Sequence, residues 1–171
     1  MLPAARPTSK LAGLLLGLGL GASLDGIVLH QIAQWHSMGS AVVPPTTMDA
    51  MRQNMTWDGM FHAASWTLIL VGVFRFYGDA KKSRRGELLP DRRTFIGLLM
   101  MGWGLFNLVE GIVDHHLLGL HHVRDLPAHI PLYDWLFLGI GGIGFILLGW
   151  ALVRPPLGQP GYNGLSRGSA L

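Results

Sequence analysis

The sequence contains no cysteine and few charged residues. The absence of thiols excludes disulfide bonds, thiolate metal ligands and cysteine nucleophiles. Charged residues make up 13% and hydrophobic residues 50% of the chain, and this charged share is about half that of an ordinary soluble protein. The mean hydropathy of +0.37 agrees. We therefore expect an integral membrane protein that contacts a lipid bilayer. We expect no nucleic-acid partner, because the basic residues lie beside apolar segments.

Four segments are apolar enough to cross a bilayer as helices, which takes about 20 residues each. They are residues 11–35, 57–77, 94–120 and 132–153. The sequence therefore predicts an all-α, integral membrane four-helix bundle with a single transmembrane domain over 1–153. Residues 154–171 are rich in Pro, Gly and Ser, so we expect a disordered cytoplasmic tail.

Basic residues concentrate between the second and third spans, in "RFYGDAKKSRRGELLPDRR". The positive-inside rule places this connection and both termini in the cytoplasm. The other two connections then face outward.

The chain contains an internal repeat. "DGIVLHQIAQWH" (25–36) aligns without gaps on "EGIVDHHLLGLH" (110–121), and "WDGMFHAASWTLILVGVF" (57–74) aligns more loosely on "YDWLFLGIGGIGFILLGW" (133–150). The bundle is therefore expected to consist of two repeated transmembrane hairpins, related by an axis along the membrane normal. The second hairpin has Leu138 where the first has His62, so a site on this axis would be asymmetric.

Many ionisable residues fall within the outer parts of these spans, where each charge costs several kcal/mol unless it is paired. This pattern indicates a functional polar site, with bound metal as the first interpretation and a metal-free proton relay as the alternative. Counting 1.5 Å per residue places His30, His62 and His115 in one layer, and these are the best candidate ligands. The other candidates, as ligands or as acceptors that orient them, are Asp58, Glu110, Asp114, His116, His121, Asp25 and His36.

The identity of the metal is less constrained. Imidazole suits copper, zinc and iron, and carboxylates shift the balance toward zinc or iron. Met48, Met51 and Met55 share one face of the outer connection and would favour Cu(I), although they could equally form the apolar side of a short interfacial helix. The residues alone therefore leave copper, zinc and iron open.

Small residues line one face of the first span. Gly13, Gly17 and Gly21 form two overlapping G-x-x-x-G steps, which let a neighbouring helix approach closely. The partner is either another helix of this chain or a second copy in a homo-oligomer.

At "DGIVLHQIAQWH" and "NLVEGIVDHHLLGLHHV" the sequence resembles a bacterial membrane family, domain of unknown function 2243, over about residues 10–153. The resemblance implies a four-helix inner-membrane protein. Genes of that family often lie near those of cytochrome oxidase assembly factors, which implies copper or respiratory chemistry and a respiratory oxidase or its assembly factors as partners.

The first functional hypothesis is a membrane metalloprotein that acts in redox chemistry or metal handling linked to respiration. A metal-dependent membrane enzyme, either a hydrolase or an oxygen-activating oxidase, is the second. A haem b electron carrier with His30 and His115 as axial ligands is the third. Composition and spacing do not decide whether the chain is an enzyme.

The orientation can be tested with single cysteines, because the chain has none of its own. We expect a cysteine at Thr47 to react with an impermeant thiol reagent on intact cells, and a cysteine at Ser83 to react only after lysis. Reaction at position 83 but not at position 47 would reverse the assigned orientation.

Overall fold

The computed structural model describes residues 10–83 and 89–154, so the expected tail lies outside the described residues from position 155 onward. Within the described part, four helices are long and apolar enough to cross a membrane, and there is no strand. They span Leu11–Ile32, Met48–Lys82, Arg92–Leu117 and Pro131–Val153. The prediction of an all-α protein with four membrane-length helices is confirmed.

Three of the four long helices change their winding along their length. α1 (Leu11–Asp25) continues into the π-helix η1 (Gly26–Ile32), and α3 (Arg92–Glu110) continues into the π-helix η2 (Gly111–Leu117). The last span comprises α4 (Pro131–Leu136), the π-helix η3 (Phe137–Gly144) and α5 (Phe145–Val153), whereas α2 (Met48–Ser83) is α-helical throughout. Single π-helical turns inside α-helices occur often at functional sites.

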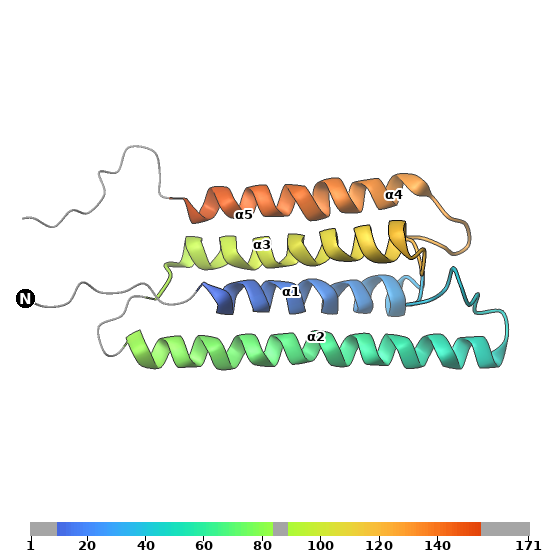
Figure 1. Ribbon diagram of the computed structural model, residues 1–171, viewed down its shortest axis with the longest axis horizontal. Helices are drawn as coiled ribbons and strands as arrows, with labels where there is room; N and C mark the ends of the chain where they lie inside the picture. Colours follow the sequence, from blue (N-terminus) through green and yellow to red (C-terminus); the bar gives the residue numbers. More distant parts are fainter. Residues whose placement is uncertain (1–9, 84–88, 155–171) are drawn as a thin grey trace, which may run out of the picture.

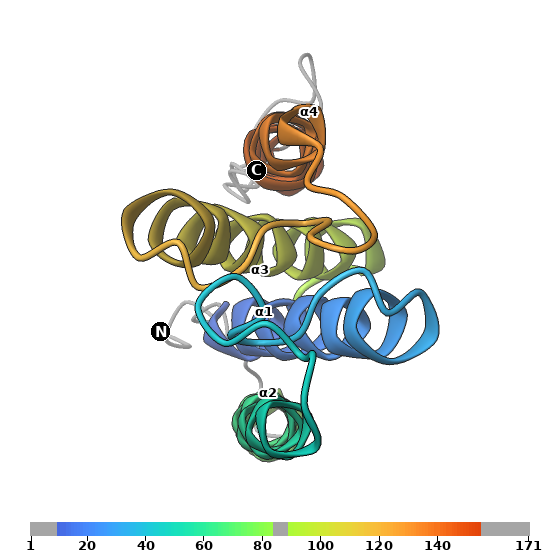
Figure 2. The same cartoon turned by 90° about the vertical axis from the view of Figure 1, so that its right-hand side faces the viewer.

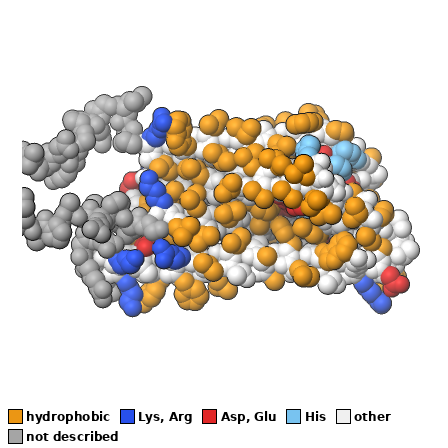
Figure 3. All heavy atoms as spheres, in the orientation of Figure 1, with side chains coloured by type: hydrophobic (Ala, Val, Ile, Leu, Met, Phe, Trp, Pro, Cys, Tyr) orange, Lys and Arg blue, Asp and Glu red, His pale blue; other side chains and the backbone are white. Residues whose placement is uncertain are grey.

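The four spans lie side by side in a row (Figures 1 and 2). α1 and α3 are central and pack on each other, α2 packs on the outer side of α1, and η3 and α5 pack on the outer side of α3. The central helices are about half buried, while the outer two expose most of their apolar side chains. The band of apolar side chains along the molecule in Figure 3 suits contact with lipid.

The central helices meet at glycines. A Cβ atom added at Gly17 would lie 2.1 Å from the carbonyl oxygen of Leu99, and one added at Gly102 would lie 2.2 Å from that of Leu14. Only a residue without a side chain fits this approach of two backbones. The glycine face of the first span is thus occupied by α3 of the same chain, which is the first of the two expected partners.

The two ends of the row differ in charge. On the face shown in Figure 3, most Lys and Arg side chains lie at the end where α2 finishes and α3 begins, and the histidines lie toward the opposite end. At the basic end, Asp91 caps α3 by accepting a hydrogen bond from the backbone N–H of Thr94 at 3.0 Å, which lowers the pKa of the Asp91 carboxyl. The site described next is at the histidine end.

The close approach of the central helices can be tested by Gly17→Ala. The added methyl group meets backbone rather than a movable side chain, so we expect a loss of about 1–3 kcal/mol in the free energy of unfolding. Gly59→Ala is the matched control, because its Cβ would have no neighbour within 4 Å and alanine favours a helix over glycine by roughly 0.5–1 kcal/mol. Thermal unfolding in detergent measures both, and a Gly17→Ala variant as stable as Gly59→Ala would contradict the packing.

Candidate metal centre

The two central helices end in the same way. The π-helical hydrogen bonds from Ala33 N–H to the Val28 carbonyl and from Leu118 N–H to the Val113 carbonyl both measure 2.8 Å. The chain then turns through a residue with left-handed backbone, Gln34 (φ 51°) in the first hairpin and Gly119 (φ 58°) in the second. This turn folds each connection back over the end of its helix.

The two connections at the histidine end, residues 33–47 and 118–130, pair with each other above the helix ends. Ala41 N–H donates to the Leu120 carbonyl at 3.0 Å, and Leu126 N–H donates to the Trp35 carbonyl at 2.8 Å. The pairing closes the outer end of the α1–α3 pair with backbone from both connections. Side chains that follow each turn therefore point into an enclosed space.

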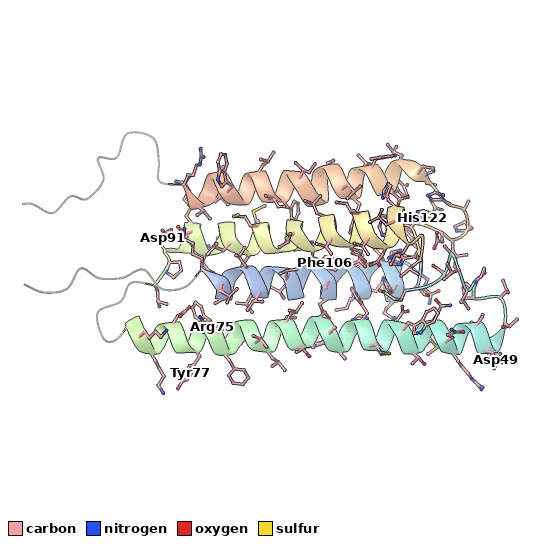
Figure 4. The ribbon with its side chains drawn as sticks, viewed as in Figure 1. Asp49, Arg75, Tyr77, Asp91, Phe106 and His122 are labelled. Atoms are coloured by element: carbon pink, nitrogen blue, oxygen red, sulfur yellow. The ribbon has the colours of Figure 1, made fainter. Side chains whose placement is uncertain are left out.

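Six ionisable side chains meet in this space, and we call them the buried cluster. None is more than 8% exposed, and His121 is 0% exposed. The rings of His36 and His121 stack with centroids 4.5 Å apart. The members of the buried cluster are Asp25, His30, His36, Glu110, His115 and His121. The ring of His115 lies 6.4 Å from that of His122, which is labelled in Figure 4.

Two histidines of the cluster are held by backbone carbonyls of the opposite connection. His36 Nδ1 donates to the Val123 carbonyl at 2.9 Å, and His121 Nδ1 donates to the Met38 carbonyl at 3.1 Å. A carbonyl oxygen only accepts hydrogen bonds, so Nδ1 of each ring must carry the proton. The second ring nitrogen, Nε2, of each of these histidines is left facing the interior of the cluster.

The other two histidines of the cluster, His30 and His115, face carboxylates of the flanking helices α2 and α4. His30 Nδ1 lies 2.9 Å from Asp58 Oδ1, and His115 Nδ1 lies 3.4 Å from Asp134 Oδ1. Each carboxylate is itself oriented by a backbone N–H, that of Met38 for Asp58 and that of Val123 for Asp134, both at 2.8 Å. A carboxylate that holds the outer nitrogen of an imidazole is the usual orienting partner of a metal-ligating histidine.

The inner atoms of the cluster face one another without partners. His30 Nε2 lies 3.3 Å and His36 Nε2 lies 3.8 Å from Asp25 Oδ2. His121 Nε2 lies 3.5 Å from Glu110 Oε1. None of these atoms has a hydrogen-bond partner, nor does Glu110 Oε2. Such groups each cost about 1–3 kcal/mol when buried unpaired, and a cation among them would remove that cost.

The protonation state of His121 bears on what can lie between its ring and Glu110. Burial, reinforced by the neighbouring His36, His115 and His30, lowers the pKa of His121 well below its usual range. The ring is therefore neutral at physiological pH, and its inward lone pair faces a carboxyl oxygen of Glu110. Lone pairs that face each other at this distance need a proton or a metal ion between them.

Three sets of ligand atoms within the cluster have spacings that suit one ion. The atoms of each set lie within 4.8 Å of one another. The sets share members, so the cluster is a continuous group of donors rather than separate sites. They are His30 with His36 and His121, Glu110 with His115 and His121, and Asp25 with His30 and Glu110.

Four of the ten candidate residues are not members of the buried cluster, and one of them, Asp58, contacts His30 Nδ1 from outside it. His62 is half-buried, and a Cβ on Gly26 would meet its ring at 2.5 Å, so it packs on η1 and not beside His30 and His115 as the depth argument expected. Asp114 is half-buried and belongs to none of the sets of ligand atoms. His116 is exposed, and its ring lies 5.0 Å from that of Trp135.

The physical reason is the π-helical winding. An α-helix turns by about 100° per residue. A π-helix has i→i+5 hydrogen bonds, so the side chains of η1 and η2 are rotated from the positions that a continued α-helix would give them. His36 and His121 follow the two π-helices and enter the cluster because the chain turns back at positions 34 and 119.

A pocket of about 390 Å³ opens beside the cluster on the side of the first hairpin. Its lining includes His30, His36 and Asp58 together with Met51 and Met55. Met48 does not line the pocket and is 65% exposed. Met51 and Met55, in the first turns of α2, therefore line the pocket together with two histidines of the buried cluster.

A family model described as "Predicted membrane protein (DUF2243)" matches residues 12–155. The match includes all four apolar helices and the whole buried cluster. No curated protein and no solved structure matches the chain. The resemblance noted in the sequence is thus confirmed by the family model.

Proposed function

The chain belongs to this family of predicted membrane proteins, and we propose that it is an integral membrane metalloprotein whose buried cluster holds transition-metal ions near the outer face. The observation that carries the proposal is the convergence of unpartnered donor atoms. Nε2 of His30, His36 and His121 points inward with a carboxyl oxygen of Asp25 or Glu110 as nearest neighbour. The outer nitrogens are already occupied, so each imidazole has one nitrogen left for an ion.

The centre is proposed to hold two ions. A tetrahedral ion takes four ligands, and one such ion would leave two members of the six-residue cluster unpaired. Each half of the chain supplies two imidazoles and one carboxylate. The first half supplies Asp25, His30 and His36, and the second supplies Glu110, His115 and His121.

Two ions are proposed because the chain is proposed to consist of two similar transmembrane hairpins, each of which supplies one set of ligands. The glycine contacts between α1 and α3, the hydrogen bonds between the outer connections and the positive φ angles all occur at positions that the repeat aligns. The two flanking spans, the second and the fourth, also support the hairpin repeat, but their alignment needs one correction. Gly72 packs on Leu16 as Gly149 packs on Met101, whereas the ungapped alignment pairs Gly72 with Leu148. The π-helix η3 supplies the extra residue.

Copper is the first candidate for the metal. Imidazole nitrogen binds copper well, and thioethers select Cu(I), so Met51 and Met55 would suit copper on its way to His30 and His36. Zinc and iron are the alternatives, because carboxylate ligands shift the balance toward these two metals. With the histidine end outward, as the basic residues at the other end favour, the centre would load from the periplasmic side of a bacterial inner membrane. A role in redox chemistry or metal handling, with a respiratory oxidase or its assembly factors as partners, rests on the resemblance alone.

The geometry disfavours haem. The ring of His36 lies 4.4 Å from that of His30, and the ring of His121 lies 4.9 Å from that of His115. These two rings occupy the space between His30 and His115, where a porphyrin would have to lie. A metal-free proton relay stays the competing interpretation, because a proton between His121 and Glu110 would also relieve the facing lone pairs.

A second candidate function is a metal-dependent enzyme that acts on a substrate dissolved in the membrane. An apolar pocket of about 270 Å³ reaches Asp25 and Asn107, and its walls include Trp103, Phe137 and Phe145. Asn107 Oδ1 is buried without a hydrogen-bond partner, so it could accept one from a bound molecule. This pocket favours a small apolar substrate with a polar group.

Elemental analysis of protein purified without added metal tests the proposal. We expect wild-type protein to carry about two transition-metal ions per chain, and His36→Ala or His121→Ala to lose most of them. His62→Ala is the matched control, because His62 is a histidine of the same bundle outside the cluster. Wild-type protein without metal would favour the proton relay, and equal losses in His62→Ala and His36→Ala would contradict the ligand assignment.

The pocket provides a second test. If Met51 and Met55 help copper reach the centre, replacing both with leucine should slow loading at limiting Cu(I) several-fold and leave the final copper content unchanged. Met48→Leu is the control on the same helix, since Met48 lies outside the pocket. If the double variant loads copper at the wild-type rate, Met51 and Met55 do not take part in loading and serve only as apolar surface.

A further inference from the structure

A second group of ligand atoms lies outside the buried cluster, on the connection between η2 and α4 and the start of α4. His122 Nδ1 and His129 Nε2 both approach one carboxylate oxygen, Asp134 Oδ2, at 3.1 Å and 3.0 Å. The ligand atoms of these three residues lie within 4.8 Å of one another. We call this group the outer triad.

The two imidazoles are held face to face. Their ring centroids are 3.9 Å apart and their planes differ by 17°. His122 Nδ1 is buried and has no hydrogen bond despite its short distance to Asp134 Oδ2. A single carboxylate oxygen thus has two ring nitrogens beside it, of which only His129 forms a hydrogen bond. A shared ion would use all three atoms after a rotation of the imidazoles, because each ring nitrogen binds an ion in the plane of its ring and the two planes are now nearly parallel.

The outer triad is open to the outside, unlike the buried cluster. The His122 side chain is 26% exposed and that of His129 is 40% exposed, whereas that of Asp134 is 5% exposed. An ion held by two imidazoles and one carboxylate would have room for a water molecule as fourth ligand. Two histidines, one carboxylate and one water form a common tetrahedral zinc environment.

The outer triad belongs to the second hairpin alone. The alignment of the repeats, extended beyond 121, places Ser37 opposite His122 and Pro44 opposite His129. Asp58, which aligns with Asp134, instead faces the pocket lined by Met51 and Met55. The two halves of the chain therefore present different ligand chemistry at the outer surface, thioether in one and imidazole with carboxylate in the other.

We propose that His122, His129 and Asp134 form a separate, exchangeable binding site for a divalent transition-metal ion, with Zn²⁺ as the best match. The second oxygen of Asp134 already serves His115, which lies 3.4 Å from Oδ1, so the site adjoins the buried cluster through one carboxylate. The ion reaches the outer triad directly from the outside, without crossing the paired connections. This inference does not depend on metal in the buried cluster.

Zinc titration of the full chain in detergent tests the inference. After brief chelation to strip exposed sites, calorimetry should show one additional Zn²⁺ bound per chain. His129→Ala should weaken this binding at least about 100-fold, because losing a group that merely orients a ligand already costs roughly 10- to 100-fold. Co²⁺ in place of Zn²⁺ should give visible absorption bands of a four-coordinate ion, and the same variant should lose them.

His116→Ala is the matched control, since His116 is an exposed histidine of the same hairpin that belongs to none of the groups of ligand atoms. His122→Ala is the second variant and should behave as His129→Ala does. Equal Zn²⁺ binding by wild type, His129→Ala and His122→Ala would overturn the inference. The metal retained after chelation reports the buried cluster separately, so loss of one site leaves the other measurable.

Discussion

The arrangement of this protein depends on one electrostatic constraint, the burial of six ionisable side chains close to one another. Four imidazoles and two carboxylates lie at the outer end of the central helices with at most 8% exposure. Nδ1 of His36 and of His121 donates to a backbone carbonyl, and Nδ1 of His30 pairs with Asp58. His115 Nδ1 lies 3.4 Å from Asp134 Oδ1, and the inner atoms of the cluster face one another. A cation would relieve the cost of these facing, unpartnered atoms, which is why we interpret the cluster as a metal centre.

The rest of the structure holds these groups together. Glycine contacts bring α1 and α3 close enough for donors from both helices to share one space. π-helical turns and left-handed residues fold the connections inward, and the connections then supply the carbonyls that orient His36 and His121. The outer helices contribute one orienting carboxylate each and otherwise face lipid. The proposed hairpin repeat accounts for this division, because each half supplies the same parts.

The four helices and most members of the cluster can be predicted from the sequence, whereas the positions that depend on contacts between the two connections cannot. Apolar length was sufficient to predict four helices, and the repeat identified the aligned pairs of Asp25 with Glu110, His30 with His115 and His36 with His121 that form the cluster. Counting 1.5 Å per residue places His62 beside His30 and His115 as a metal ligand, because that count treats the spans as ideal α-helices up to the membrane surface. π-helical winding and the return of the chain after position 34 depend on tertiary hydrogen bonds between the two connections, which no local pattern encodes. His129 was missed because it belongs to no repeat.

X-ray absorption at the edge of the co-purified metal tests the central claim most directly. The account predicts imidazole nitrogen and carboxylate oxygen at about 2.0–2.2 Å, with outer-shell scattering typical of histidine and a second metal ion at about 3.5–4 Å. Replacing His36 or His121 should remove imidazole scattering from this signal. A shell of sulfur at about 2.3 Å, or histidine scattering unchanged in both variants, would contradict a centre built from the buried cluster.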